Sequence, residues 1–356
     1  MSSTWGKNVN VSIFGESHGQ AIGVTINGLP AGFALDMAEI NKYMAKRKPG
    51  GNLATPRSED DLPVILSGVF EGKTTGAPLT AIIYNKNTKS GDYDNISHCA
   101  RPGHADYTAF VKYNGANDYR GGGHFSGRLT ACIVFAGAVC SQILKSQGIE
   151  IFAHISSINN VKDIAFGIDV SDEIKEKLNC NFPVIDDVAG ENMKQRVSVA
   201  SALGDSVGGT IECMVTGLPA GMGSPMFDGV ENKIASIMFG IPAVKGIEFG
   251  LGFESANLFG SQNNDEFYVD GDAIKTKTNN CGGVLGGITN GMPVVFRVAF
   301  KPTPSIAQKQ NTIDFKTNQN TTIEVNGRHD PCVVLRATPV VTAATAIALL
   351  DLLYEI

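Results

Sequence analysis

The sequence predicts one mixed α/β domain over 1–356 that is built from two related halves. Three observations lead to this prediction: β-branched apolar segments alternate with longer helical patterns, glycine is abundant at 41 of 356 residues, and one motif occurs twice. Gly15-Glu-Ser-His-Gly19 followed by Gly28-Leu-Pro-Ala-Gly32 recurs 189 residues later, without a gap, as Gly204-Asp-Ser-Val-Gly208 followed by Gly217-Leu-Pro-Ala-Gly221. Self-similarity at a fixed offset is the signature of a repeated structural unit. We therefore expect an internal duplication with pseudo-two-fold symmetry, with halves at about 10–150 and 197–356; a chance match is the alternative.

In both copies the motif is expected to run from a strand through a turn into a helix. The β-branched segments 21–26 and 210–215 predict strands, and the two Gly-Leu-Pro-Ala-Gly sequences predict the turns that follow them. Helices are expected at 36–46 and 228–238. Asp36 and Asp228 are the expected N-caps, because a short carboxylate side chain can accept hydrogen bonds from the first backbone N–H groups of a helix.

The rest of the pattern fits the same fold class. Hydrophobic periodicity predicts strands at 62–70, 77–84, 150–156 and 292–300, and helices at 129–146 and 342–354. The polar stretch 157–196 is expected to be a surface insertion between the halves. The apolar run 340–350 is too short for a membrane span and is expected to be a core helix.

Composition limits the class of protein. The 29 Lys and Arg residues against 35 Asp and Glu give a net charge of −6, which argues against general binding to nucleic acids or to anionic membranes. The first residues lack the basic and apolar segments of a secretory signal. The seven cysteines form no C-x-x-C pair, so we expect reduced thiols in a cytoplasmic protein without a metal site.

The histidines lie mostly in Gly-rich or Arg-rich segments rather than in periodic core patterns. His18 stands in the first copy of the motif where the second copy has Val207. Flanking glycines let a backbone approach a ligand closely, and an imidazole exchanges a proton near neutral pH. His18 is therefore a candidate acid or base, with a hydrogen-bonded structural histidine as the alternative.

Two later segments combine cationic side chains with glycine turns. Arg101-Pro-Gly-His104-Ala-Asp106 places a guanidinium, an imidazole and a carboxylate around a Pro-Gly turn, although Asp106 could instead cap the helix that follows. Arg120-Gly-Gly-Gly-His-Phe-Ser-Gly-Arg128 precedes an apolar helix and is similar to loops that present backbone N–H groups to a phosphate. It is neither a Walker sequence nor a dinucleotide fingerprint.

Most arginines lie in or beside these Gly/Pro-rich segments. Because guanidinium groups match carboxylate and phosphate geometry, a small polyanionic ligand is expected, with scattered surface salt bridges as the alternative. Lys301-Pro-Thr-Pro-Ser305 adds a cation and hydroxyl groups, and Asp330 is a further acid or base candidate. These residues predict a cytoplasmic α/β enzyme that acts on a small anion by proton transfer, without identifying the reaction. The arginines are Arg47, Arg57, Arg101, Arg120, Arg128, Arg328 and Arg336.

Together with Ala243-Val-Lys-Gly246, Gly260-Ser-Gln262 and Gly327-Arg-His-Asp-Pro-Cys332, these motifs resemble those of the chorismate synthase family, in order and over nearly the whole chain. The resemblance implies a lyase that converts 5-enolpyruvylshikimate 3-phosphate to chorismate and phosphate. It further implies a 1,4-elimination that requires reduced FMN, in the last shared step toward the aromatic amino acids. A β-α-β sandwich, a homotetramer and a cytoplasmic location are also expected. Whether the chain reduces FMN with NADPH stays open.

The resemblance also implies roles for individual residues. His18 would protonate or hydrogen-bond the leaving phosphate, His104 would lie near flavin N1 and O2, and Asp330 would accept the proton from flavin N5. The residues implied to hold substrate anions are Arg47, Arg101, Arg128 and Arg328. The residues implied to line FMN are His124, Phe125, Ser126, Pro242, Ala243, Gly286, Lys301, Pro302, Thr303, Pro304, Ser305 and Arg328.

The chain departs from the family pattern at a few positions. His124 and Phe125 stand where many members have Arg-Ser, and Leu53 stands where a second arginine is often found, with Arg57 nearby. Two other classes of protein are the alternatives. A flavin-binding module without catalysis would leave His18 and the Arg-His-Asp group without a role. An FMN-dependent oxidoreductase would consume NADPH in proportion to its product.

Overall fold

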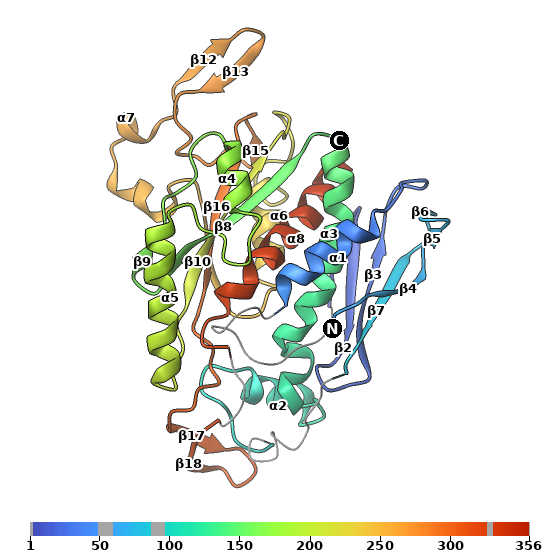
Figure 1. The fold of residues 1–356 in the computed structure, drawn as a ribbon, viewed down its shortest axis with the longest axis vertical. Coiled ribbons are helices and arrows are strands. Elements are labelled where there is room, and N and C mark those ends of the chain that lie inside the picture. The colour runs from blue at the N-terminus through green and yellow to red at the C-terminus, as the bar shows by residue number, and fades with distance from the viewer. Residues whose placement is uncertain (1–2, 49–59, 87–96, 326–329, 356) are drawn as a thin grey trace.

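Two five-stranded antiparallel sheets form the outer layers of the molecule (Figure 1). The structure is a computed structural model and describes residues 3–48, 60–86, 97–325 and 330–355. The first sheet has the order β1 (Thr4–Trp5), β2 (Asn10–Gly15), β3 (Ala21–Asn27), β7 (Leu79–Tyr84) and β4 (Val64–Ser67). The second has the order β11 (Val244–Phe249), β16 (Val294–Phe300), β10 (Gly209–Thr216), β8 (Glu150–Ile158) and β9 (Val161–Lys162).

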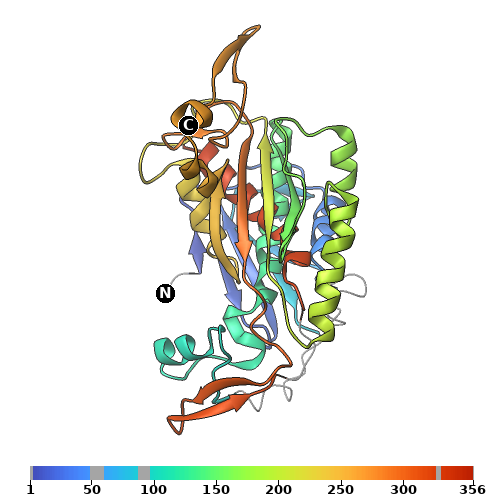
Figure 2. The same ribbon diagram turned by 90° about the vertical axis from the view of Figure 1, so that its left-hand side faces the viewer.

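Helices fill the space between the sheets. They are α1 (Met37–Arg47), α3 (Thr130–Ser146), α6 (Val230–Met238) and α8 (Val334–Leu353). Helix α3 contacts β2 and β3, helix α8 contacts β8 and β10, and the two helices pack on each other. At their contact a Cβ atom on Gly137 would lie 2.3 Å from the Cα of Ala343, so only glycine allows this approach. The expected β-α-β sandwich is therefore observed (Figure 2).

Both long apolar helices belong to the core. The segments Gly127–Ser146 and Val334–Leu353 are long and apolar enough to cross a membrane, but 78% and 89% of their apolar 18-residue windows are buried inside the protein. Their hydropathy therefore reflects packing between the sheets, as expected for 340–350. Helix α8 begins at Val334 and runs through Pro339, so its predicted start at 342 was too late.

The remaining elements lie around the sandwich. The strands are β5 (Val69–Phe70), β6 (Lys73–Thr74), β12 (Phe267–Asp270), β13 (Ala273–Thr276), β14 (Val284–Leu285), β15 (Ile288–Thr289), β17 (Gln310–Asp314) and β18 (Gln319–Ile323). The helices are α2 (Asp106–Tyr113), α4 (Asp172–Lys177), α5 (Asp187–Ala202) and α7 (Gly260–Asn263), with 3₁₀ turns at Arg120–Phe125, Gly127–Leu129 and Gly252–Asn257. The predicted strand at 62–70 is split into β4 and β5 at Gly68.

The helix caps were predicted with mixed success. Asp36 caps α1 as expected, since its carboxylate accepts hydrogen bonds from the N–H groups of Ala38 and Glu39. The prediction for Asp228 was wrong, because Gly229 is the N-cap of α6 and no side chain caps that helix. Asp106 is not a cap either: it is the first residue of α2, and its carboxylate binds Arg101.

The polar stretch 157–196 is more ordered than a loose insertion, since it contains α4 and most of α5, and α5 packs on β8 and β9. A row of charges crosses the outer face of the sheet beneath it. His154 lies between Asp163 and Glu212, at 2.8 Å from Nδ1 and 3.0 Å from Nε2. Arg297 then bridges Glu212 and Glu248. Asp163 also accepts hydrogen bonds from the N–H groups of Ile185 and Asp186. This row of charged side chains therefore links the polar stretch 157–196 to the sheet.

Burial alone would lower the pKa of His154, but its hydrogen bonds with Asp163 and Glu212 outweigh burial and raise that pKa. The imidazolium therefore contributes stability that is fully present below the unfolded pKa of about 6.5 and is lost as the pH rises through the folded pKa. We expect His154→Gln to lower the free energy of unfolding by about 3–5 kcal/mol near pH 6, with a smaller loss at pH 9. Urea denaturation between pH 6 and pH 9 measures this loss of unfolding free energy, with a substitution of the exposed Lys162, Lys162→Gln, as control. A loss that grew with pH would contradict the assignment.

Candidate active site

The loop between β2 and β3 carries His18 into the interior. Ser17 and His18 are both buried. The N–H of Ser17 donates to the carbonyl of Gly123 at 3.1 Å, which joins this loop to the triple-glycine loop. From the other side, the Asn85 side chain donates to the carbonyls of Glu16 and Gly19 at 3.0 and 2.9 Å. The first motif is thus fixed to two segments far along the chain.

Three consecutive left-handed glycines bring two histidines together. Gly121, Gly122 and Gly123 have φ values of 59°, 84° and 53°, which side chains rarely allow. A Cβ atom on Gly121 would lie 2.3 Å from Cε1 and Nδ1 of His18, and one on Gly122 would lie 3.3 Å from Nε2 of His104. The loop therefore holds both imidazoles against neighbouring backbone positions.

Arg101, His104 and Asp106 form a closed group. Asp106 accepts hydrogen bonds from Arg101 Nε at 2.7 Å and Nη2 at 2.8 Å, and its Oδ1 lies 2.6 Å from His104 Nδ1. Burial alone would raise the pKa of Asp106, but the hydrogen bonds from Arg101 and His104 lower it well below its usual range. Because this carboxylate only accepts, Nδ1 of His104 donates to it and Nε2 faces Gly122. Arg101 also donates to Ser305 at 3.1 Å.

A second buried group surrounds Asp61. Its two oxygens pair with Arg47, at the end of α1, and with Arg128, just before α3. Burial alone would raise the pKa of Asp61, but the two guanidinium groups outweigh it and lower that pKa. Burial, with the positive charges of Arg336 and Arg128 nearby, lowers the pKa of Arg47 to about 10 despite Asp61. Arg47 still carries its charge at neutral pH.

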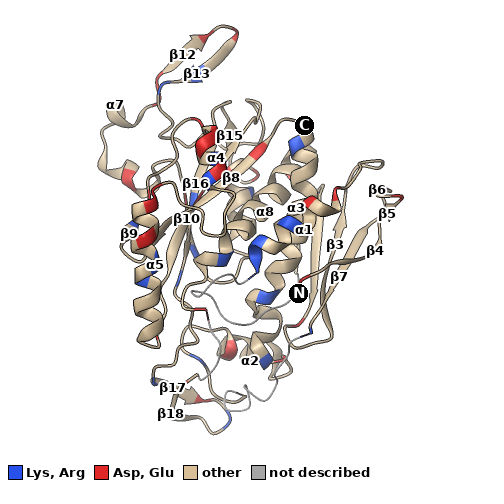
Figure 3. Cartoon of the chain, viewed as in Figure 1, with Lys and Arg blue, Asp and Glu red and all other residues tan. Residues whose placement is uncertain are grey.

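Asp330 and Arg336 extend this cluster. Arg336, in the first turn of α8, pairs with Asp330 at 2.7 Å, and its Nε donates to the carbonyl of Arg47 at 3.1 Å. Three guanidinium groups, of Arg47, Arg128 and Arg336, thus face two carboxylates. The N-termini of α3 and α8, which carry partial positive charge, begin beside them. The surplus of positive charge makes this end of the helix layer suited to anions (Figure 3).

The segment 301–305 connects the two groups. Lys301 Nζ donates to the carbonyl of Gly103, and the Lys301 N–H donates to the carbonyl of Ala243 at 3.0 Å. Thr303 Oγ1 donates to the carbonyl of Asp330 at 2.8 Å. Burial and the nearby charge of Lys245 lower the pKa of Lys301. The contacts therefore form a closed ring, through Asp330, Arg336, Arg47, Asp61, Arg128, Asn85, the His18 loop, Gly121–Gly123, His104, Arg101 and 301–305.

The other residues that the resemblance assigns to FMN differ in their contacts and in their exposure. Ser126 accepts from the N–H of Arg128, and His124 Nδ1 lies 2.8 Å from the carbonyl of Gly15. Phe125 is partly exposed and packs against Tyr113. Pro242 is exposed beside Ala243, which has a left-handed φ of 73°.

Gly286 lies apart from the ring. It forms the turn between β14 and β15, close to the end of β10 that is remote from Lys301. Within one chain, the structure does not bring Gly286 to the other predicted residues. Arg328, Leu53 and Arg57 lie outside the described residues.

Sequence reasoning gave no role to several residues of the ring. Asp61 and Asn85 carry no motif signal, and neither does Asp118, whose carbonyl lies against the Gly123 position next to the ring. Arg336 was noted among the clustered arginines. Its position six residues after Asp330, at the start of an apolar helix, is the signal that could have paired the two.

The fold and this ring define an α/β enzyme that acts on a small polyanionic molecule. The chain matches the family model described as chorismate synthase over residues 9–354. It is 47% identical over 360 residues to a chorismate synthase of Dehalococcoides mccartyi strain BAV1, covering 99% of this chain and 96% of that protein. The chorismate synthase of Thermococcus kodakarensis is 46% identical over 347 residues, covering 97% and 96%. A crystal structure of chorismate synthase superposes with a TM-score of 0.75, at 31% identity, over 99% of this chain and 93% of that one.

The chain belongs to the chorismate synthase family. It is a lyase that converts 5-enolpyruvylshikimate 3-phosphate to chorismate in the shikimate pathway. Membership of the family implies a requirement for reduced FMN.

The triple glycine gives a direct test of the ring. We expect Gly121→Ala to lower turnover by about tenfold or more, because the new methyl group would displace His18 from its place. Gly167→Ala is the matched control, since Gly167 has an ordinary φ and its nearest neighbour would lie 3.8 Å away. Turnover with reduced FMN and thermal unfolding are measured for both. Wild-type turnover by Gly121→Ala would show that the close contact between Gly121 and His18 is not needed for activity.

Proposed function

We propose that the enzyme forms chorismate by a 1,4-elimination with no net redox change: phosphate leaves one end of the allylic system of the substrate, and a proton leaves the other. The cluster of guanidinium groups that Asn85 joins to the His18 loop is the observation that supports this most directly. The substrate carries two carboxylates and a phosphate, and preorganised cations stabilise the charge that develops on a leaving phosphate.

The proposal assigns the substrate anions to Arg47, Arg128 and Arg336. Among the described residues Asp61 and Asp330 offset two of these three charges, so an added anion would complete the balance. Arg47 Nε is buried and has no hydrogen-bond partner among the described residues. Arg101, in contrast, is fully engaged with Asp106 and Ser305, so we assign it the task of positioning His104.

His18 is proposed as the donor to the departing phosphate. It is buried against Gly121, and its charge interacts with the carboxylate of Asp118. A positioned imidazolium that donates to a leaving oxygen is a general acid, typically worth roughly 10² to 10⁴ in rate. Asp330 is proposed as the final acceptor of the proton. Its ion pair with Arg336 fixes its orientation.

The residues present fit reduced FMN. Ser17 Oγ is buried beside the Gly121 position without a hydrogen-bond partner among the described residues, so a polar ligand group would satisfy it. We propose that His104, Ser126, Ala243 and 301–305 hold the cofactor, without Gly286 of the same chain. When bound, reduced FMN supplies electron density that assists the loss of phosphate. Lys301 provides a positive charge for its anionic groups, and His104 provides Nε2, held in place by Asp106.

The proposal includes a homotetramer in the cytoplasm. Large apolar side chains are exposed on the single chain, among them Phe227, Phe253 and Phe259, at 85%, 84% and 79%. The β12–β13 hairpin projects from the body and exposes Val269 (Figure 2). Apolar area of this size favours association between copies. Size-exclusion chromatography with light scattering tests it, and a monomer at micromolar concentration would reject it.

We also propose that the two halves derive from a duplication within one domain. The order β1-β2-β3-β7-β4 parallels the order β9-β8-β10-β16-β11 when β3 is matched with β10. Each of these two strands leads into a Gly-Leu-Pro-Ala-Gly turn, with φ values of 84° at Gly28 and 80° at Gly217. Helices α1 and α6, then α3 and α8, follow in the same order. Because β8 and β9 precede residue 197, the matched elements run from β1 to α3 and from β8 to α8. Superposition of residues 4–146 on 150–353 tests this, and unmatched strand paths would reject it.

An anaerobic assay tests the function. Purified protein with chemically reduced FMN and 5-enolpyruvylshikimate 3-phosphate is expected to form chorismate, followed by its ultraviolet absorbance, with the flavin still reduced at the end. Oxidised flavin in proportion to product would support the oxidoreductase alternative, and FMN binding without turnover would support the binding module. Replacing the chemical reductant by NADPH tests the further proposal that the enzyme reduces its own FMN.

Substitutions test the assigned roles. We expect His18→Ala and His104→Ala each to lower turnover by about tenfold or more, while FMN binding survives in the first. Asp330→Asn is expected to lower turnover with little change in KM, because the amide cannot accept the proton. The exposed Asp169→Asn is the matched control. Full activity in any of the three would remove that residue from the proton path.

A further inference from the structure

A histidine, a cysteine and an aspartate lie together outside the ring, where the β17–β18 hairpin meets the segment that leads into Arg101. The N–H of Ala100 donates to the carbonyl of Ile313 at 3.3 Å, and the N–H of Phe315 donates to the carbonyl of His98 at 3.0 Å. Between these bonds Cys99 pairs with Asp314 in an antiparallel bridge. Directly opposed residues of this non-hydrogen-bonded kind carry their side chains close together on one face. The backbone pairing therefore fixes the thiol beside the carboxylate.

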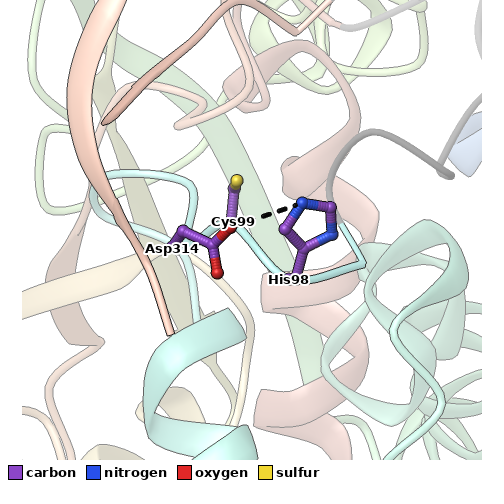
Figure 4. A group of neighbouring side chains, drawn as sticks. All are labelled: His98, Cys99 and Asp314. Carbon is purple, nitrogen blue, oxygen red and sulfur yellow. Dashed lines mark ion pairs between the residues drawn. The ribbon is translucent and has the colours of Figure 1, made fainter. Parts of the chain in front are cut away.

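The three donor atoms have the spacing of a metal site. The ligand atoms of His98, Cys99 and Asp314 all lie within 4.8 Å of one another (Figure 4). His98 Nε2 is 3.6 Å from Asp314 Oδ2, which is too long for a good hydrogen bond. It is close to the separation of about 3.4 Å between two ligands of a tetrahedral ion with bonds of about 2.1 Å. This pair therefore suits a shared cation better than a direct contact.

The second polar atoms of Asp314 and His98, Oδ1 and Nδ1, already have hydrogen-bond partners. Asp314 Oδ1 accepts hydrogen bonds from the N–H groups of Lys316 and Thr317 at 2.9 and 3.0 Å, which leaves Oδ2 turned toward His98. His98 Nδ1 lies 3.1 Å from Ser97 Oγ. When Nδ1 donates to that hydroxyl group, Nε2 keeps its lone pair for a metal. Second contacts of this kind orient histidine and carboxylate ligands in metalloproteins.

We propose that His98, Cys99 and Asp314 bind one thiophilic divalent cation of the Zn²⁺ class, with water as the fourth ligand. A thiolate with an imidazole favours such a metal over Mg²⁺ or Ca²⁺, which prefer oxygen ligands. Among the described residues this is the single group of three such donors within reach of one another. The prediction of no metal site rested on the absence of C-x-x-C pairs. Spacing rules of that kind miss ligands that a hairpin brings together from distant positions.

The place of the site suggests what a bound cation does. It would fasten the hairpin to the segment that ends in Arg101, and Arg101 in turn holds Asp106 and, through it, His104. The cation is therefore expected to steady one side of the active site without touching the substrate. None of the three ligands belongs to the ring of catalytic contacts, so binding can be measured apart from turnover.

Cobalt titration of the full chain tests the proposal. After treatment with a chelator, one equivalent of Co²⁺ is expected to give the visible bands of tetrahedral cobalt and a thiolate-to-cobalt charge-transfer band, both removed by Zn²⁺. Cys99→Ser is expected to abolish the charge-transfer band, and His98→Ala and Asp314→Asn to weaken binding at least tenfold. Cys180→Ser is the control, because Cys180 is the exposed free thiol and lies outside the cluster.

Several results of this titration would contradict the metal site. Absence of a thiolate–cobalt band in the wild-type protein would overturn the proposal, as would a band that persists in Cys99→Ser and disappears in Cys180→Ser. A thermal shift keeps the test independent of folding defects in the variants: Zn²⁺ is expected to raise the Tm of the wild-type protein and of Cys180→Ser, but not that of a folded Cys99→Ser. An equal shift in all three would reject the site.

Discussion

The close approach of Gly121, Gly122 and Gly123 to their neighbours is the constraint on which the active site depends. A side chain at these positions would meet the ring of His18, the ring of His104 or the carbonyl of Asp118. The two histidines come from different segments of the chain. Their common support is this loop, whose left-handed backbone only glycine adopts readily. The proton transfer proposed for His18 and His104 therefore depends on this backbone conformation.

The positive charges of the site come from arginines at the ends of the helices between the sheets. Arg47 ends α1, Arg128 precedes α3 and Arg336 begins α8, so the sandwich brings three cations to one end of the packed helices. Gly137 lets α3 and α8 pack closely, which keeps their N-termini side by side at that end. Burying these cations is unfavourable unless they are paired. Among the described residues each has a carboxylate partner, but Asp61 and Asp330 carry two negative charges against three positive ones. In the proposed function the polyanionic substrate supplies the remaining negative charge, so the same cations would serve both binding and the stability of the site.

The fold could largely be predicted from the sequence, because strands, turns and the helix over 129–146 have strong local patterns. Asp36 was predicted as a cap for the same reason. Asp228 and Asp106 met the same local rule, but a neighbouring glycine cap and a guanidinium partner decided their structure. His18, His104 and Asp330 stood in motifs and were found as candidates. Asp61 and Asn85 were not, because they matter only through partners that the fold brings from far along the chain.

The ring from His18 to Asp330 is proposed to bind substrate and cofactor together. A crystal structure of the protein with FMN and 5-enolpyruvylshikimate 3-phosphate tests this most directly. We expect the substrate phosphate within hydrogen-bond distance of His18, its carboxylates on Arg47 or Arg336, and the flavin beside His104 and 301–305. Both ligands bound elsewhere, for example in the cavity of about 90 Å³ lined by Tyr43, Lys46 and Thr338, would contradict it.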